Sequence, residues 1–210
     1  MVKKSEGKFT VSNDAISAFL FDGQGGAEEI QPSELSELQG RDNQYSFAWI
    51  HLKRDTREAQ KWLETCGLDN FVVGALTAED TRPRCTVHGD GAIVILRGVN
   101  LNPGAEPEDM ISARFWIEGR RIVGVWRRPL AAISDLFDSM QRGQAPVSPG
   151  DMIAKLALRL ADNAEPVVAS LNERIDDLEE QLLNANGAPT RGELAEIRRV
   201  AIIMRRFMIP

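Results

Sequence analysis

The chain has 210 residues, of which 43% are hydrophobic and 27% charged, and its formal net charge at pH 7 is −6. This length suits one domain with a well-filled core and an extension, and the composition is that of a folded globular protein rather than a disordered or collagenous one. The acidic balance argues against general binding to phosphate backbones, which depends on clustered Lys and Arg, so we expect no nucleic-acid partner.

The first part of the chain mixes strand and helix signals. Residues 15–23 and 45–52 are rich in aromatic and branched side chains and are bounded by Gly, Asp and Asn, so both predict strands. The period then changes to that of a helix over residues 56–68. Asp55 can cap the start of this helix, and Gly67 stands where a helix C-terminus favours a left-handed residue.

A second short helix is expected over residues 70–80, ended ahead of Pro83. Residues 84–100 then form two strand-like runs around "GDG", a hairpin turn signal. The second run, "AIVIL", is apolar on both faces and is expected to lie centrally in the sheet. Residues 110–128 repeat the pattern with a turn at "EG". The sequence therefore predicts two consecutive hairpins.

Residues 129–143 predict a helix, with Pro129 near its first turn and Gly143 just past its end. Consecutive hairpins combined with several helices predict an α/β sandwich whose sheet is mixed but largely antiparallel. We assign this fold to residues 1–145 as one domain. The Pro- and Gly-rich stretch at 144–151 marks its end.

After this break the pattern is purely helical. From Ile153 the apolar residues recur in steps of three and four, which predicts one long amphipathic helix. Pro166 interrupts the pattern, and we expect a kink there because proline removes a backbone hydrogen bond and clashes with the preceding turn. The stripe consists of Leu156, Leu160, Ala164, Val167, Leu171, Ile175, Leu178 and Leu182.

A turn is expected at residues 184–193, followed by a second, antiparallel helix. Its apolar stripe consists of Leu194, Ile197, Ala201, Met204 and Met208. Its last twenty residues carry five arginines against two glutamates. This pattern fits an exposed helix, a partner-binding helix, or the cytoplasmic approach to a membrane helix, where basic residues accumulate. We assign residues 146–210 to a helical arm that includes the start of a stalk helix.

The two cysteines and two histidines are the first candidates for metal ligands. Cys85 and His88 lie on opposite faces of a strand, because successive side chains alternate, so they cannot converge on one ion. Cys85 is expected to be a small buried group and His88 a polar residue beside the turn. His51 and Cys66 are single candidates, whereas a structural zinc site needs four convergent ligands. We therefore expect no metal site.

Catalysis and secretion are also disfavoured. Two histidines without a nucleophile elbow, phosphate loop or dinucleotide fingerprint offer no catalytic constellation, so we expect neither enzyme activity nor a cofactor. Two cysteines make no disulfide framework, and the N-terminus does not resemble a secretory signal. No window approaches eighteen consecutive apolar residues. The fragment is expected in the cytosol with reduced thiols.

An acidic stripe is the remaining candidate functional feature. Glu173, Asp176, Asp177 and Glu180 stand at i, i+3, i+4 and i+7 on one helix face. One interpretation is an ordinary solvated face. The other is a surface that concentrates cations near a conduit, because charges of one sign focus the field.

Four segments carry a resemblance that extends over nearly the whole chain. They are "TRPR" (81–84), "ILRGVNLNPGAEPEDMISARFWIEGRRIV" (95–123), "NAEPVVASLNERIDDLEEQLL" (163–183) and "IRRVAIIMRRFMIP" (197–210). The chain resembles the cytoplasmic region of the CorA-type divalent cation transporters, and most of all their ZntB zinc-transport branch. The Gly-Met-Asn signature of that family, at the end of its first membrane helix, does not occur within these 210 residues.

The resemblance implies a homopentamer whose α/β domains form a funnel on the cytoplasmic side of the bacterial inner membrane. Long helices would run toward the bilayer and two membrane helices would follow. Zinc would be the transported ion. Two alternatives stay open: a magnesium or cobalt transporter of the same family, and a soluble regulatory protein whose helical arm binds a partner.

Overall fold

The computed structural model describes residues 14–34, 45–79, 82–183 and 191–208. Its body is a seven-stranded sheet of order β2-β1-β3-β7-β6-β5-β4. The β3–β7 pair is parallel and the other described pairs are antiparallel, which confirms the predicted mixed sheet. The strands are β1 (Ile16–Phe21), β2 (Ala27–Ile30), β3 (Phe47–Lys53), β4 (Arg84–His88), β5 (Gly91–Gly98), β6 (Ile111–Glu118) and β7 (Arg121–Trp126).

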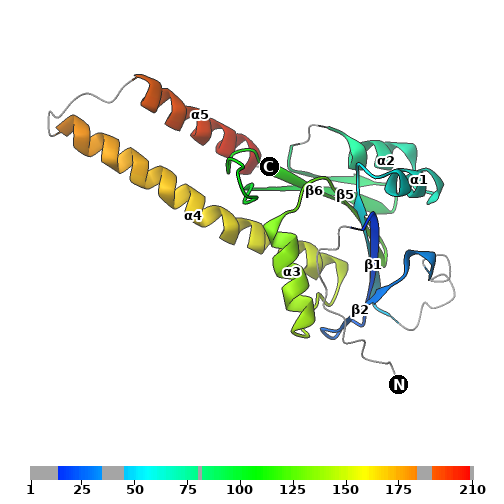
Figure 1. Ribbon diagram of the computed structural model, residues 1–210. Helices are drawn as coiled ribbons and strands as arrows, with labels where there is room; N and C mark the ends of the chain where they lie inside the picture. Colours follow the sequence, from blue (N-terminus) through cyan, green and yellow to red (C-terminus); the bar gives the residue numbers. More distant parts are fainter. Residues whose placement is uncertain (1–13, 35–44, 80–81, 184–190, 209–210) are drawn as a thin grey trace.

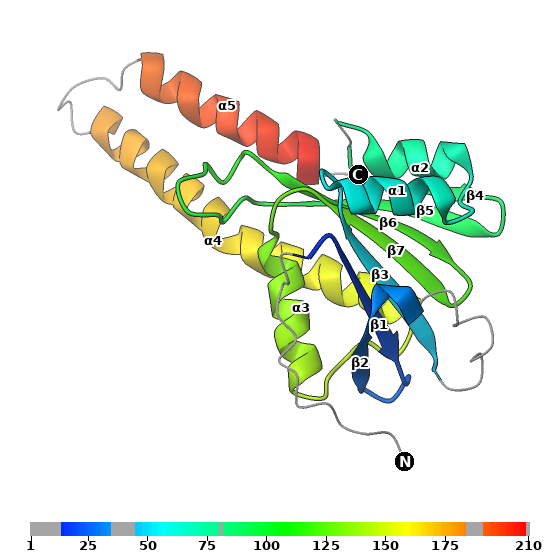
Figure 2. The same cartoon turned by 45° about the vertical axis from the view of Figure 1, so that its right-hand side comes forward.

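Helices cover both faces of the sheet (Figure 1). One face is covered by α1 (Arg57–Thr65) and α2 (Asn70–Thr77), and the other by α3 (Ala131–Gln141) and the first part of α4 (Pro149–Leu183). Beyond the sheet α4 continues outward, and α5 (Arg191–Met208) returns antiparallel beside it toward the sheet (Figure 2). The predicted sandwich followed by long antiparallel helices is confirmed.

Strand alternation divides the interior into two cores. On β3, Trp49 faces α3 and α4, whereas Ile50 and Leu52 face α1 and α2. Likewise, Phe115 and Trp116, which are neighbours on β6, belong to opposite cores. The inner strands are apolar on both sides because both faces are covered.

Strand β2 was not predicted. The chain leaves β1 through a turn in which the Asp22 carboxylate accepts hydrogen bonds from the backbone N–H groups of Gln24 and Gly26, at 2.7 and 2.9 Å. Gly25 adopts φ +100°, which only glycine tolerates well. The short sequence "AEEI" that follows has two exposed glutamates at the sheet edge, so it carries little hydrophobic signal.

Two expectations about local structure are corrected. Thr56, not Asp55, is the N-cap of α1, and its hydroxyl accepts the Ala59 N–H at 3.4 Å. Asp55 instead pairs with Arg54 and Arg127, at 3.0 Å each. The apolar strand β5 is an inner strand but lies next to the edge strand β4; β7 occupies the middle. Gly67 does adopt the left-handed φ, +75°.

The long helix α4 runs through Pro166 from Pro149 to Leu183, and its apolar stripe faces inward as predicted. Buried or half-buried stripe residues extend from Leu156 to Leu178. The expected turn at 184–193 falls mostly outside the described residues, as do the side chains of Leu182 and Met208. The division into domains at residues 145 and 146 stays a prediction.

Candidate functional site

The acidic stripe lies on the outer half of α4, away from the sheet (Figure 1). Its members Glu173, Asp176, Asp177 and Glu180 are exposed, whereas Leu178 in the same turns is buried. Within the described parts of the chain, no three His, Cys, Asp or Glu side chains are grouped to hold a metal ion. The stripe is therefore a solvent-facing charged surface.

The Cys85 and His88 pair is separated as predicted, but Cys85 is exposed rather than buried. It lies on the edge strand β4, on the face opposite α2, where Val87 is also 78% exposed. His88 turns to the other face and contacts the start of α2: its Nε2 lies 3.6 Å from an Asp69 carboxylate oxygen, and its ring centroid lies 4.8 Å from that of Phe71. Both residues are surface features of an edge strand.

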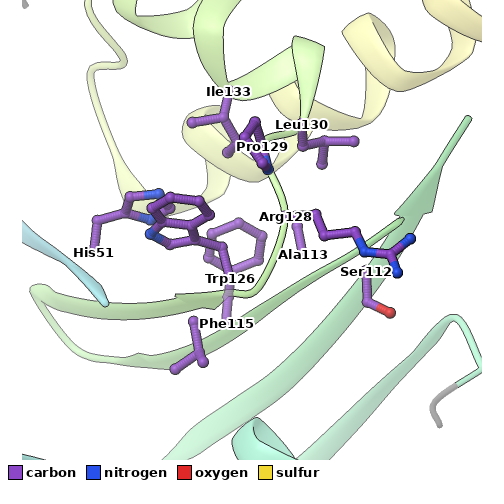
Figure 3. A pocket seen from close by; sticks show the side chains of 10 residues that line it. His51, Ser112, Ala113, Phe115, Trp126, Arg128, Pro129, Leu130 and Ile133 are labelled. Carbon is purple, nitrogen blue, oxygen red and sulfur yellow. The ribbon is translucent and has the colours of Figure 1, made fainter. Parts of the chain in front are cut away.

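The other two single candidates are core or cap residues. The Cys66 thiol donates to the Leu63 carbonyl at 3.3 Å, at the end of α1. His51 is buried beneath the start of α3, with its ring stacked against Trp126 at 5.6 Å (Figure 3). Burial lowers the pKa of His51 to about 3, so the imidazole is neutral at pH 7.

A narrow pocket of about 10 Å³ beside His51 has room for about one water molecule (Figure 3). Nδ1 of His51 has no hydrogen-bond partner among the described residues, so such a water would satisfy it. The rest of the lining is mainly apolar, including Phe115, Trp126 and Leu130. This arrangement is that of a buried core histidine with room for a water beside its ring.

The most specific arrangement is the contact between the sheet and the helical arm. We call it the arm junction, and it consists of Arg97, Val99, Glu108, Ala164, Arg199, Val200, Met204 and Phe207. Val99, immediately after β5, forms a buried cluster with Ala164 of α4 and with Val200 and Met204 of α5. This cluster is separate from the two cores of the sheet.

The loop between β5 and β6 is shaped by the "RGVNLNPG" segment. The side-chain Oδ1 of the buried Asn100 accepts hydrogen bonds from the backbone N–H and the side-chain amide of Asn102, at 3.2 and 2.7 Å. The same Asn102 amide donates to the Pro129 carbonyl at 3.0 Å. These bonds connect the loop that carries Glu108 to the segment that precedes α3.

Polar contacts complete the arm junction. Arg199 of α5 donates to a carboxylate oxygen of Glu108 at 2.7 Å, and also pairs with Glu196 at 2.8 Å. The Glu108 side chain is only 9% exposed. At the last turn of α5, the guanidinium carbon of Arg97 lies 3.9 Å from the centroid of the Phe207 ring. Helix α5 is thus attached to the sheet by apolar, ionic and cation–π contacts.

Sequence reasoning did not assign roles to these residues. Glu108 and Arg199 are 91 positions apart, and nothing in a single sequence pairs them. One usable signal was present: the connection between β5 and β6 is too long and too rich in Asn, Pro and Gly for a simple hairpin turn.

Two relatives with curated names match nearly the whole chain. The divalent cation transporter CmaX of Pseudomonas aeruginosa is 33% identical over 198 residues, covering 93% of this chain and 59% of the relative. The zinc transport protein ZntB of Pectobacterium carotovorum is 33% identical over 205 residues, covering 97% and 61% respectively. The chain therefore spans about three fifths of the length of these relatives.

Solved structures agree with this similarity. The structure of the full-length CmaX protein has a TM-score of 0.83 and 31% identity, covering 95% of this chain and 62% of that one. The ZntB cytoplasmic domain from Vibrio parahaemolyticus has a TM-score of 0.70 at 20% identity, covering 91% and 73%. The second likeness shows a shared fold.

Among the described helices, none is long and apolar enough to cross a membrane. The family model for the CorA-like Mg²⁺ transporter protein matches residues 44–210, which include most of the sheet and both helices of the arm. The chain belongs to the CorA-like transporter family.

Proposed function

We propose that the chain is the cytoplasmic part of a divalent cation transporter of the bacterial inner membrane, with zinc as the transported ion and no enzymatic activity of its own. The observation that carries this proposal is the arm junction. It attaches α5 to the β5–β6 loop at Glu108 and to β5 at Arg97. A change in the body would therefore be transmitted to α5 and to membrane helices that follow it.

Zinc is favoured over magnesium or cobalt by the similarity to a protein named as a zinc transporter. The preference for zinc rests on this similarity alone. The described residues contain no cluster of Cys and His ligands that would add to it. A magnesium or cobalt transporter of the same family is the alternative. The choice of ion would be made by the membrane segments rather than by this part of the protein.

Assembly into a homopentamer is part of the proposal. Helices α4 and α5 carry large apolar side chains on their outer surfaces, among them Leu158 at 64% and Ile202 at 54% exposure. Such residues are candidates for contacts between copies of the chain. The five-fold number comes from the resemblance to the family, since an apolar stripe would serve a dimer equally well.

The acidic stripe would concentrate cations near the transport path. Converting Glu173, Asp176, Asp177 and Glu180 to amides should lower cation flux by the full-length transporter at low ionic strength. A control variant with amides at four exposed carboxylates of the body, Glu64, Asp90, Glu106 and Asp138, should retain its flux. Equal flux in both variants would leave the stripe as a solvated face.

The test of the function is metal uptake into liposomes that carry the full-length protein. Zinc and magnesium are compared, each with and without a pH gradient. Zinc uptake supports the proposal. Uptake of magnesium but not zinc would move the protein to the alternative, and no uptake of any divalent cation would contradict the transporter function.

A further inference from the structure

Strand β4 ends the seven-stranded sheet, and no described strand lies on its outer side (Figure 2). It pairs with β5 through a hairpin whose two-residue turn joins His88 to Gly91. Such a turn is closed by a hydrogen-bonded pair, and in an antiparallel ladder the residues that bond the neighbouring strand alternate with residues that do not. Counting back from His88, the backbone N–H and C=O groups of Val87 and Cys85 therefore point outward, away from β5.

Apolar side chains are exposed beside this edge on both faces of the sheet. On the face opposite α2, Val87 is 78% exposed and Cys85 is exposed two residues before it. On the other face, the ring of His88 packs against Phe71 of α2, which is itself 55% exposed. The side chains of an extended strand alternate between faces, so a strand laid along β4 would bury apolar groups against both.

The charge along this edge changes sign from one end to the other. Arg82 and Arg84 are exposed at the start of β4, and no carboxylate in the described part of the chain forms an ion pair with either. At the other end, Asp90 lies in the turn, and an Asp69 carboxylate oxygen lies 3.6 Å from Nε2 of His88. An antiparallel strand would match this pattern with carboxylates toward its C-terminal end and a basic residue at its N-terminal end.

We propose that β4 binds an extended segment of a partner protein as an additional, antiparallel strand of the sheet. The outward backbone groups of Cys85 and Val87 would supply the hydrogen bonds, and the alternating side chains would supply the selectivity. The segment that fits has apolar residues opposite Cys85 and Val87 and carboxylates opposite Arg84 and Arg82. This partner site on the body goes beyond the proposed transport function and does not depend on it.

The two edges of the sheet differ in how they meet solvent. Edge strands are commonly protected from pairing by short length and by charged side chains. Strand β2 follows this rule, because it has four residues, of which Glu28 and Glu29 are exposed, and its one large apolar residue, Ile30, is buried. Strand β4 carries the charged Arg84 but also exposes Val87 in its outward-facing part. Protection against pairing therefore explains β2 but not β4.

Binding of a designed peptide to the 210-residue chain tests the proposal. The peptide KLVTVESE, laid antiparallel along β4, places its valines opposite Val87 and Cys85 and its glutamates opposite Arg84 and Arg82. Fluorescence anisotropy of the labelled peptide should show saturable binding below about 1 mM. The peptide KLPTPESE lacks the two N–H groups that would bond the edge, and ELVTVKSK has its charges reversed. Both should bind at least about tenfold more weakly.

Variants of the chain locate the binding to β4. Val87→Pro removes an outward N–H that β5 does not use, so the sheet should remain folded while KLVTVESE binds about tenfold more weakly or less. Arg84→Glu should weaken the binding of KLVTVESE and strengthen that of ELVTVKSK. Arg191→Glu makes the same charge change at the exposed start of α5 and should alter neither. The Arg84 variant suffices by itself if the Val87 variant misfolds.

Three results would overturn the proposal. The first is the absence of saturable KLVTVESE binding up to about 1 mM, and the second is equal binding of KLVTVESE and KLPTPESE. The third is a dimer of the chain alone, detected by light scattering and abolished by Val87→Pro, because a second copy would then occupy the edge. None of these measurements involves ion transport, so a negative result leaves the transporter function to its own test.

Discussion

The sheet body and the helical arm obtain their stability in different ways. The largest fully buried side chains, such as Trp49, Phe115 and Leu136, all belong to the body or to the first turn of α4. The arm exposes Leu183, Leu194 and Ile202, and α5 contacts the sheet at the arm junction. The packing of the body can therefore hold the body together by itself. The position of the arm depends instead on the few contacts of the arm junction.

The largest effect is expected from a change in the body. Phe115→Ala removes a ring that is 1% exposed in the core beneath α3 and α4, and should lower the free energy of unfolding by about 3–5 kcal/mol. Urea denaturation monitored by tryptophan fluorescence measures this loss. Val87→Ala, at a position that is 78% exposed, is the control and should stay within about 0.5 kcal/mol of the wild type. Equal losses would contradict the assignment of the core.

A change at the arm junction should release the arm without unfolding the body. Met204→Ala empties a site that is 4% exposed and should destabilise the docked position of α5 by about 2 kcal/mol. Amide hydrogen exchange should accelerate in α5 while exchange in β3 and β7 stays slow. Leu194→Ala, on the exposed side of α5, should leave both unchanged. Acceleration throughout the sheet would show that arm and body unfold together.

Acid should weaken the body through His51. Its pKa is about 3 when folded and near 6.5 when unfolded, because burial disfavours the charged ring. Above pH 6.5 the ring is neutral in both the folded and the unfolded protein, so burying His51 costs no stability through protonation. Between pH 6.5 and pH 3 the unfolded protein binds a proton at this ring and the folded protein does not. His51 should therefore cost stability of about 2 kcal/mol at pH 5, increasing toward pH 3. Urea denaturation between pH 7 and 5 should show a shallower decline in the free energy of unfolding for His51→Gln than for the wild type, and an equal decline would contradict the assignment.

The sequence predicts individual helices and strands better than it predicts which distant segments pack against each other. Alternation along "ISARFWIE" marks β6 and its two faces, and the steps of three and four after Ile153 mark α4, because those patterns depend only on the residues themselves. The exposure of Cys85 depends on β4 being the edge strand, which follows from the strand order. The arm junction depends on contacts between distant segments, such as Glu108 with Arg199, so it could not be deduced from local periodicity.

The cysteines are expected to contribute little. Cys66→Ala should cost about 1 kcal/mol, since its half-buried thiol caps a carbonyl of α1, and Cys85→Ala should cost less because that side chain is exposed. Together they fall at the low end of about 1–3 kcal/mol. Unfolding of the wild-type protein by a chelator at neutral pH would contradict this expectation, because it would reveal a structural metal.

A substitution at Ile202 should have the smallest effect on the stability of the chain and a large effect on its assembly with other copies. Ile202 is 54% exposed on α5, so Ile202→Ser should change the free energy of unfolding of the isolated chain by no more than about 0.5 kcal/mol. In the full-length protein the same residue would meet another copy, and a hydroxyl there would leave an apolar contact unmade. The variant should therefore shift the oligomer toward smaller species in light scattering, while Arg198→Gln, an exposed change on the same helix, should not. Unchanged assembly of the Ile202 variant would show that Ile202 does not lie in the contact between copies. The exposure of this side chain would then be no argument for the proposed oligomer.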